Sequence, residues 1–226
     1  MRLALLPALS LLLATCVDTR ADDNPQGNFG GFHYGRIQQD LSALQASQPV
    51  LEGLDERPWL LGGFIFTSQG GTILGFKGDV GWRKHPGDTV DIRRFDGDLF
   101  VHFGRAMEAG SLYHAWFSGG VGWMSSRLNL RRQPGGGHWN DLFDGTYTSS
   151  TLSLSGPAWE VLLGSDIRTQ MPNMDTGAWL TLGLLLSYKQ QFGQNLWTLN
   201  GADELRGAPS ADVGGPSLMI TLGWRY

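Results

Sequence analysis

The last stretch of the chain, residues 218–226, constrains the fold more than any other segment. In an extended strand, one side carries only apolar and aromatic residues, Leu218, Ile220, Leu222, Trp224 and Tyr226, and the other side carries Met219, Thr221, Gly223 and Arg225. A strict period of two predicts a β-strand rather than a helix. The wholly apolar side requires an apolar environment, which is either a protein core or hydrocarbon.

Alternation of the same kind recurs along the chain and predicts an all-β protein. Glycine supplies 33 of the 226 residues, against a usual share of about 7%, and these glycines lie inside apolar runs, as in strongly curved strands that pack closely. Eight alternating segments are expected at residues 28–39, 59–68, 72–83, 93–105, 111–128, 157–168, 178–190 and 217–226. One amphipathic helix is expected at about residues 41–54.

The charged residues of these segments gather on one face and the large apolar residues on the other. In the third segment, Lys77, Asp79 and Arg83 alternate with Phe76 and Trp82. The same alternation places further residues on the charged face, namely Asp96, Asp98, His102, Glu160, Asp166, Arg168, Lys189 and Arg225. Both signs are represented, which suits a narrow lumen filled by ion pairs, since a charge facing lipid costs about 2–4 kcal/mol at the midplane. A soluble barrel with its apolar face inward is the alternative.

The connections and the aromatic residues favour a membrane barrel. Short turns follow the second, fourth and sixth segments, and longer ones follow the first, third, fifth and seventh. Short turns at one end and long loops at the other are typical of outer-membrane barrels, with both termini on the periplasmic side. Several aromatic residues lie toward segment ends, where interfacial girdles belong: Tyr34, Trp59, Trp82, Tyr113, Trp123, Trp159, Tyr188, Trp224 and Tyr226.

Residues 1–21 have the pattern of a secretory signal peptide. Arg2 precedes an apolar run from Leu3 to Ala14, and small and polar residues lead to Ala21. The run is too short for a spanning helix, and we expect cleavage to leave residues 22–226 as one barrel domain. The single cysteine, Cys16, is expected to leave with the signal rather than to be acylated. The net charge of −4 does not indicate the positively charged surface that nucleic-acid-binding proteins need, so nucleic acid is not an expected partner.

These features together resemble the small outer-membrane β-barrels of the OmpA, OmpX and opacity-protein type. The resemblance rests on the signal peptide, the eight alternating segments, the loop asymmetry and the terminal strand. It implies an eight-stranded antiparallel transmembrane β-barrel in the cell outer membrane, with short periplasmic turns and long extracellular loops. The implied partners are outer-membrane lipids, including lipopolysaccharide, and the barrel-assembly machinery, which would recognise Leu218, Ile220, Leu222, Trp224 and Tyr226.

Candidate chemistry is limited to a few histidines. His102 and His114 fall on inward faces among carboxylates, where a structural partner is expected rather than a catalytic base. The polar loop after the fifth segment contains His138, Asp141 and Asp144, which are candidates for binding an extracellular ligand. The spacing of these three residues along the loop matches no recognised metal-binding motif. We therefore predict no catalytic set, metal or cofactor.

The function predicted from the sequence is that of a non-enzymatic integral outer-membrane protein, structural or surface-binding through its extracellular loops. Two alternatives stay open. One is an outer-membrane enzyme that modifies lipid A or a glycan. The other is a narrow passive channel or a barrel associated with exopolysaccharide export.

Overall fold

The computed structural model describes residues 27–47, 51–52, 54–86, 90–109, 112–132, 149–169, 179–193, 197–199, 203–204 and 211–226. The expected signal peptide with Cys16 and the loop candidates His138, Asp141 and Asp144 lie outside this described part. Within it, no helix is both long and apolar enough to cross a membrane.

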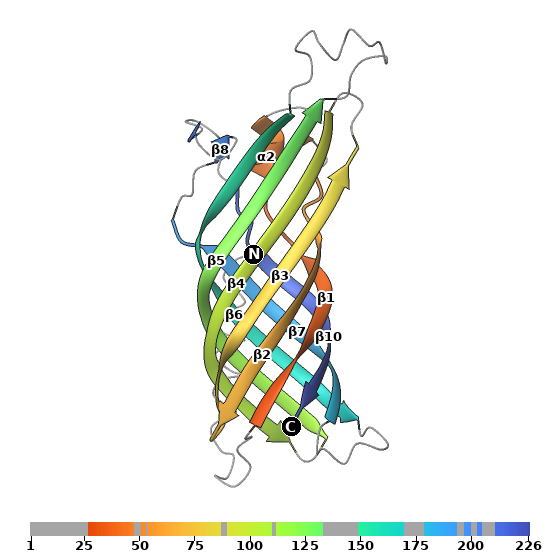
Figure 1. Cartoon of the computed structure of the whole chain (residues 1–226), viewed down its shortest axis with the longest axis vertical. Coiled ribbons are helices and arrows are strands. Elements are labelled where there is room, and N and C mark those ends of the chain that lie inside the picture. The colour runs from red at the N-terminus through yellow and green to blue at the C-terminus, as the bar shows by residue number, and fades with distance from the viewer. Residues whose placement is uncertain are drawn as a thin grey trace.

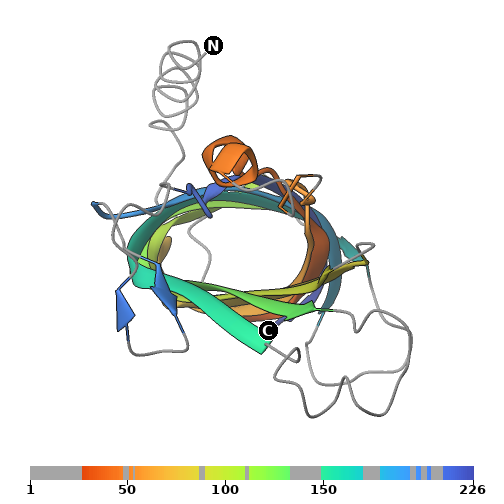
Figure 2. The ribbon, with the colours of Figure 1, turned by 90° about the horizontal axis from the view of Figure 1, so that it is seen from above.

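Eight long antiparallel strands close into a barrel (Figure 1). They are β1 (Gly27–Ile37), β2 (Trp59–Gln69), β3 (Thr72–His85), β4 (Val90–Ala109), β5 (Tyr113–Arg132), β6 (Ser149–Thr169), β7 (Trp179–Gln191) and β10 (Gly215–Arg225). Each pairs with its neighbour in sequence order, and β1 also pairs with β10. This pairing closes the ring seen from above in Figure 2. The predicted eight-stranded antiparallel barrel is confirmed.

The strands are strongly inclined to the barrel axis. Following paired residues once around the ring leads from Gly27 back to Ile37 on the same strand, a displacement of 37 − 27 = 10 residues. A stagger of this size requires strands tilted by roughly 35–45°. The tilt is visible in Figure 1.

Both ends of the described chain lie at the same end of the barrel. The Asn28 amide donates to the Tyr226 carbonyl at 3.0 Å, and the Tyr226 amide donates back at 3.1 Å. At this end β2 and β3 are joined by Gly70 and Gly71 alone, with φ of 58° and 78°. Positive φ at both residues is the requirement of a type I′ hairpin, which glycine meets without strain. This end is the expected periplasmic one.

Three additional elements lie near the opposite end (Figure 1). The helix α2 (Ser42–Ser47) is shorter than the helix expected at residues 41–54. The two-residue strands β8 (Thr198–Leu199) and β9 (Asp203–Glu204) continue the sheet from the start of β6. The connection between β3 and β4 is also shorter than expected, residues 86–89, because both strands extend beyond their predicted ends. The sixth strand begins at Ser149, not near Pro157.

The faces of the strands are arranged as in a membrane barrel and opposite to a soluble one. Leu182 and Leu222 are 54% and 52% exposed on the outside, whereas Lys77 and Glu160 are fully buried inside. The same holds for β1, where Phe32 is exposed and His33 is buried. A belt of exposed aliphatic and aromatic side chains thus surrounds a polar interior.

Two buried apolar clusters lie inside the barrel at different levels. The lower cluster, near the turn at Gly70, contains Phe29, Phe64, Phe66, Ile73, Ala106, Trp116, Leu162, Leu185 and Met219. The upper cluster, which we call the cap, brings Leu41, Leu44, Leu51 and Leu54 against Ile92, Phe100, Met124, Leu128, Leu154, Ala158, Trp197 and Val213. Charged residues of the interior lie beside the cap, where Lys77 is opposite Phe100 in the register, and also below the lower cluster, where Asp166 and Arg225 are buried.

Candidate functional site

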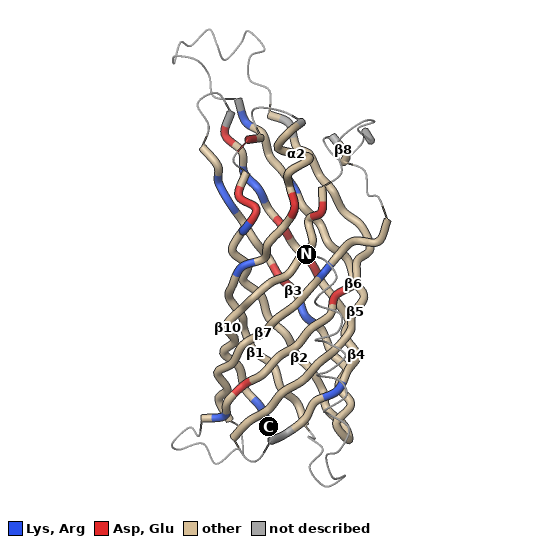
Figure 3. Tube along the Cα trace, turned by 180° about the vertical axis from the view of Figure 1, so that it is seen from behind, with Lys and Arg blue, Asp and Glu red and all other residues tan. Residues whose placement is uncertain are grey.

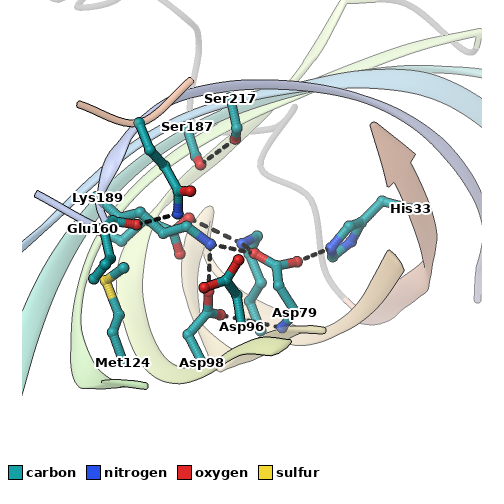
Figure 4. A network of polar contacts seen from close by, with 12 residues as sticks. His33, Asp79, Asp96, Asp98, Met124, Glu160, Ser187, Lys189 and Ser217 are labelled. Atoms are coloured by element: carbon teal, nitrogen blue, oxygen red, sulfur yellow. Dashed lines mark hydrogen bonds and ion pairs between the residues drawn. The ribbon is translucent and has the colours of Figure 1, made fainter. Parts of the chain in front are cut away.

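A network of buried charges crosses the centre of the barrel (Figure 4). Lys77 Nζ donates to Asp79 Oδ2 at 2.6 Å and to Glu160 Oε1 at 2.9 Å. Lys189 Nζ donates to the same Asp79 oxygen at 2.8 Å and also to Asp98. Each ammonium therefore lies between two carboxylates, and the network joins β3, β4, β6 and β7.

The sequence positions these groups through its period of two. Lys77 and Asp79 are two residues apart on β3, so both side chains point to the same face. Asp98 lies directly opposite Asp79 on β4, and Lys189 lies opposite Glu160 on β7. An unpaired buried charge is costly, and attraction offsets that cost only where the partners and hydrogen bonds are in place. The network meets this condition through several shared partners.

Two histidines extend the network across the lumen. His33 Nε2 contacts Asp79 Oδ1 from β1. His102 Nε2 lies 3.0 Å from Glu160 Oε2, and its Nδ1 lies 3.1 Å from Ser118 Oγ. All of these side chains are buried, so the histidines attach β1 to Asp79 and β4 and β5 to Glu160.

Ser118, His102 and Glu160 have the order of groups found in a nucleophile–base–carboxylate triad. Their exposures are 1%, 0% and 0%, and Glu160 is also bound to Lys77. Ser118 and His102 do not line the small cavity found in the barrel. Among the described residues this cavity gives a substrate no route to the Ser118 hydroxyl, which favours a structural role for Ser118, His102 and Glu160.

A second polar layer lies above the central network, beside the cap, where Arg94 is directly opposite Leu128 in the register. Arg94 Nε donates to Asp96 at 2.9 Å, and Arg94 Nη2 contacts the Gln39 side chain. Gln39 in turn donates to the Val213 carbonyl at 2.5 Å. This layer ties the segment after β1 and the segment before β10 to the inner face of β4.

A third polar layer lies near the end where the termini meet. His114 Nδ1 is 3.3 Å from Asp166 Oδ2, and the His114 ring stacks on Trp116 with centroids 5.1 Å apart. Arg225 is buried at this level and Arg168 is partly buried. The polar interior is therefore divided into layers by apolar side chains.

Arg83 lies outside the lumen, although it shares the inward face with Lys77 and Asp79. It is beyond the upper polar layer, where its guanidinium pairs with Asp55 at 2.7 Å and both side chains are partly exposed. Burial alone would raise the pKa of Asp55, but hydrogen bonds from the Arg57 amide and from Arg83 lower it below its ordinary value. Arg83 therefore fixes the loop before β2 instead of filling the barrel.

The space beside the central network is small. A cavity of about 10 Å³ adjoins Asp79, Asp96, Asp98 and Lys189, enough for about one water molecule. Among the described residues, no group of three or more His, Cys, Asp or Glu side chains is arranged to hold a metal ion.

The structure brings together most of the lumen residues expected from the sequence. Lys77, Asp79, Asp98, Glu160 and Lys189 form the central network, with His102 attached. Asp96 lies in the upper layer, and Asp166, Arg168 and Arg225 lie in the lower one, while Arg83 lies apart. Four contributors were missed, His33, Gln39, Arg94 and Ser118. The alternation along the strands could have identified two of them. Arg94 shares the inward face with Asp96, and His33 lies on the face opposite to that of Phe32 and Tyr34.

Comparisons with known proteins find likeness in architecture. No protein-family model and no curated protein sequence matches the chain. Solved structures similar to it include Neisserial surface protein A at 10% identity, covering 88% of this chain and 96% of that one, with a TM-score of 0.45. The attachment invasion locus protein Ail of Yersinia pestis, solved with the heparin analogue sucrose octasulfate, has 12% identity, coverages of 90% and 99%, and a TM-score of 0.45. The outer membrane protein OprG from Pseudomonas aeruginosa has 17% identity, coverages of 90% and 98%, and a TM-score of 0.45. The protein itself is a closed, eight-stranded antiparallel barrel.

Proposed function

We propose that the protein is an integral, non-enzymatic protein of a Gram-negative outer membrane. In this proposal the barrel is a membrane anchor with a lumen filled by ion pairs, and binding takes place at the surface it presents outside. The observation that carries the proposal is the contrast between the two sides of the wall. The outside is apolar around the ring, and the inside holds interlocked charges beside a cavity with space for about one water.

A closed barrel suits a bilayer because every strand has two neighbours. Backbone groups in hydrocarbon have no water to bind, so an open sheet edge would leave them unsatisfied. The exposed aromatic residues Trp82, Trp123 and Tyr188 lie toward the α2 end of the strands, and Tyr113 and Tyr226 lie toward the other end. This distribution supports two interfacial girdles with hydrocarbon between them.

Conductance in planar lipid bilayers tests the filled lumen. The refolded protein is added to one chamber, with a known porin as the positive control for insertion and detection. We expect no steps of porin size, because the Lys77 and Lys189 ion pairs obstruct the lumen between the cap and the lower apolar cluster. Stable porin-sized steps from the purified protein would contradict the proposal and favour the channel alternative.

Mass spectrometry of lipid A tests the enzymatic alternative. Cells with and without the protein are compared for acyl and phosphate content of lipid A. We expect identical spectra, since the buried Ser118–His102–Glu160 set is inaccessible. A mass difference that disappears when the gene is deleted would contradict the non-enzymatic proposal.

We also infer that β10 carries the signal for barrel assembly. Its outward residues Leu218, Ile220 and Leu222 are exposed along the outer wall, and Tyr226 ends the strand beside Asn28. Removal of Tyr226 is expected to lower the yield of assembled barrel in cells. The same variant refolded in detergent is the control for folding itself.

A further inference from the structure

The alternation of faces reverses where β4, β5 and β6 rise above the aromatic residues. Below the aromatic residues the outward side chains include Leu99, Val101 and Val121, whereas His102, Ser118 and Glu160 point inward. Higher up, Ile92, Leu128 and Leu154 point inward to the cap, whereas Arg93 and Arg127 are exposed on the outer face. The reversal marks the level at which hydrocarbon ends and a polar environment begins.

Four cations lie on the outer face just above that level. We call Lys84, Arg93, Arg127 and Arg131 the basic patch; all four are exposed. Lys84 of β3 is directly opposite Arg93 of β4 in the register. Arg127 of β5 is opposite Phe95, which places it diagonally beside Arg93. The patch therefore spans three adjacent strands.

The positive charge of the patch is incompletely neutralised by the protein. Lys84 Nζ lies 3.8 Å from Asp91 Oδ2, a loose contact. Within the described part of the chain, the side chains of Arg93 and Arg127 have no ion pair or hydrogen bond. Like charges directly opposite each other on a sheet are destabilising. An external anion between Lys84 and Arg93 would remove this repulsion.

The level of the patch identifies the kind of anion. Trp82 precedes Lys84 by two residues and Phe95 follows Arg93 by two, so on each strand the cation is the next outward side chain above an exposed aromatic ring. Aromatic rings of this kind lie at the level of lipid headgroups. The basic patch would then lie at the level of the headgroup phosphates.

We propose that the basic patch binds the phosphorylated headgroup of a glycolipid in the outer leaflet of the membrane. The inference rests on the proposed placement in an outer membrane. Arginine guanidinium groups donate paired hydrogen bonds to phosphate oxygens, and lysine adds a point charge. A membrane lipid is the occupant, not a free phosphate, because its acyl chains would lie along the exposed side chains of Phe95 and Leu99 immediately below.

The test measures binding of bisphosphorylated lipid A to the full-length mature protein in neutral detergent micelles. The variant Lys84→Gln/Arg93→Gln/Arg127→Gln removes three charges from the patch. We expect binding about 100-fold weaker than for the wild type. Arg105→Gln is the matched control, since Arg105 is also exposed on the outer face of β4 but near the opposite end, and its binding should equal that of the wild type.

Three results would overturn the inference. They are wild-type affinity in the triple variant, equal binding of dephosphorylated lipid A, and competition by inorganic phosphate at the same concentration as the lipid. If the triple variant does not fold, the single variants Arg93→Gln and Arg127→Gln decide the matter, each with an expected loss of several-fold and wild-type affinity as the contrary result.

Two further measurements separate the absence of a lipid site from a wrong placement of the barrel in the membrane. Heat-modifiable migration in detergent gels reports whether each variant is a folded barrel. A wild-type protein that stays dispersed as a monomer without detergent would contradict the membrane placement itself. A folded, membrane-inserted barrel that does not bind the lipid phosphate would contradict the lipid site alone.

Discussion

At the scale of single residues, Asp79 is the group on which the central network depends most. It accepts from Lys77 and Lys189 and contacts His33, all inside the barrel. We expect Asp79→Asn to destabilise the barrel by about 3–5 kcal/mol, because two buried ammonium groups lose a shared anion. Unfolding by urea in lipid vesicles, followed by tryptophan fluorescence, measures this loss.

The Asp55–Arg83 pair provides the control for a charge at the surface. Asp55→Asn should cost at most about 1 kcal/mol, since both partners are partly exposed. The lowered pKa of Asp55 means that its contribution is complete at neutral pH and is lost only as pH falls below about 4. Equal losses for Asp79→Asn and Asp55→Asn at pH 7 would contradict the role given to the central network.

Gly164 tests how tightly the lower cluster is packed. A Cβ at this position would lie 2.1 Å from two ring carbons of Trp116, which is fully buried. We expect Gly164→Ala to displace the indole, to lower stability by about 1–3 kcal/mol and to change the near-ultraviolet circular dichroism. Gly119→Ala is the matched control, because a Cβ there meets no atom within 4 Å. Unchanged spectra in both variants would show that the packing around Trp116 is loose.

At the scale of elements, the cap is a folded unit that depends on the extended parts of β4, β5 and β6. Leu44 of α2 packs in this cluster with Ile92 and Leu128. Leu44→Ala should release the segment after β1, because a buried leucine side chain contributes about 2–5 kcal/mol. Limited proteolysis should then cut within residues 38–58 while the barrel keeps its heat-modifiable migration.

The control for the cap is Leu112→Ala, whose side chain is exposed in the turn between β4 and β5. It should leave the protease pattern of residues 38–58 unchanged. Resistance of this segment in Leu44→Ala would mean that the cap is held by its polar contacts, such as Gln39 with Arg94, and not by apolar packing.

The eight strands and their faces follow from the sequence, but several strand ends do not. Within the membrane belt, Phe76 outward and Lys77 inward give an unambiguous period of two. Above the belt the pattern reverses, so the segments predicted at 93–105 and 111–128 stop near Arg93 and Arg127, although β4 begins at Val90 and β5 continues to Arg132. The prediction that Arg83 lies in the lumen was wrong for a related reason. Alternation along a strand shows which face a side chain is on, but not how far along the barrel axis it lies.

At the scale of the whole molecule, the barrel is a stack of layers inside a wall whose outer face is apolar below the basic patch. Most charges lie in the half of the barrel toward α2 (Figure 3). In this stack the two apolar clusters fill different levels of the interior, and the central charges bind each other beside a small cavity. Contacts of this kind between distant strands depend on the shear of the barrel, which the sequence does not display.

The central claim is that the apolar side of the wall faces hydrocarbon. Its most direct test places a nitroxide spin label on single cysteines, in a Cys16→Ser background, at Leu184, Leu222 and Arg131 of the protein in lipid vesicles. Labels at Leu184 and Leu222 should collide readily with oxygen and hardly with a water-soluble nickel chelate, and the label at Arg131 should behave in the opposite way. A label at Leu222 that the nickel chelate reaches as easily as the one at Arg131, or that neither reagent reaches, would contradict the account.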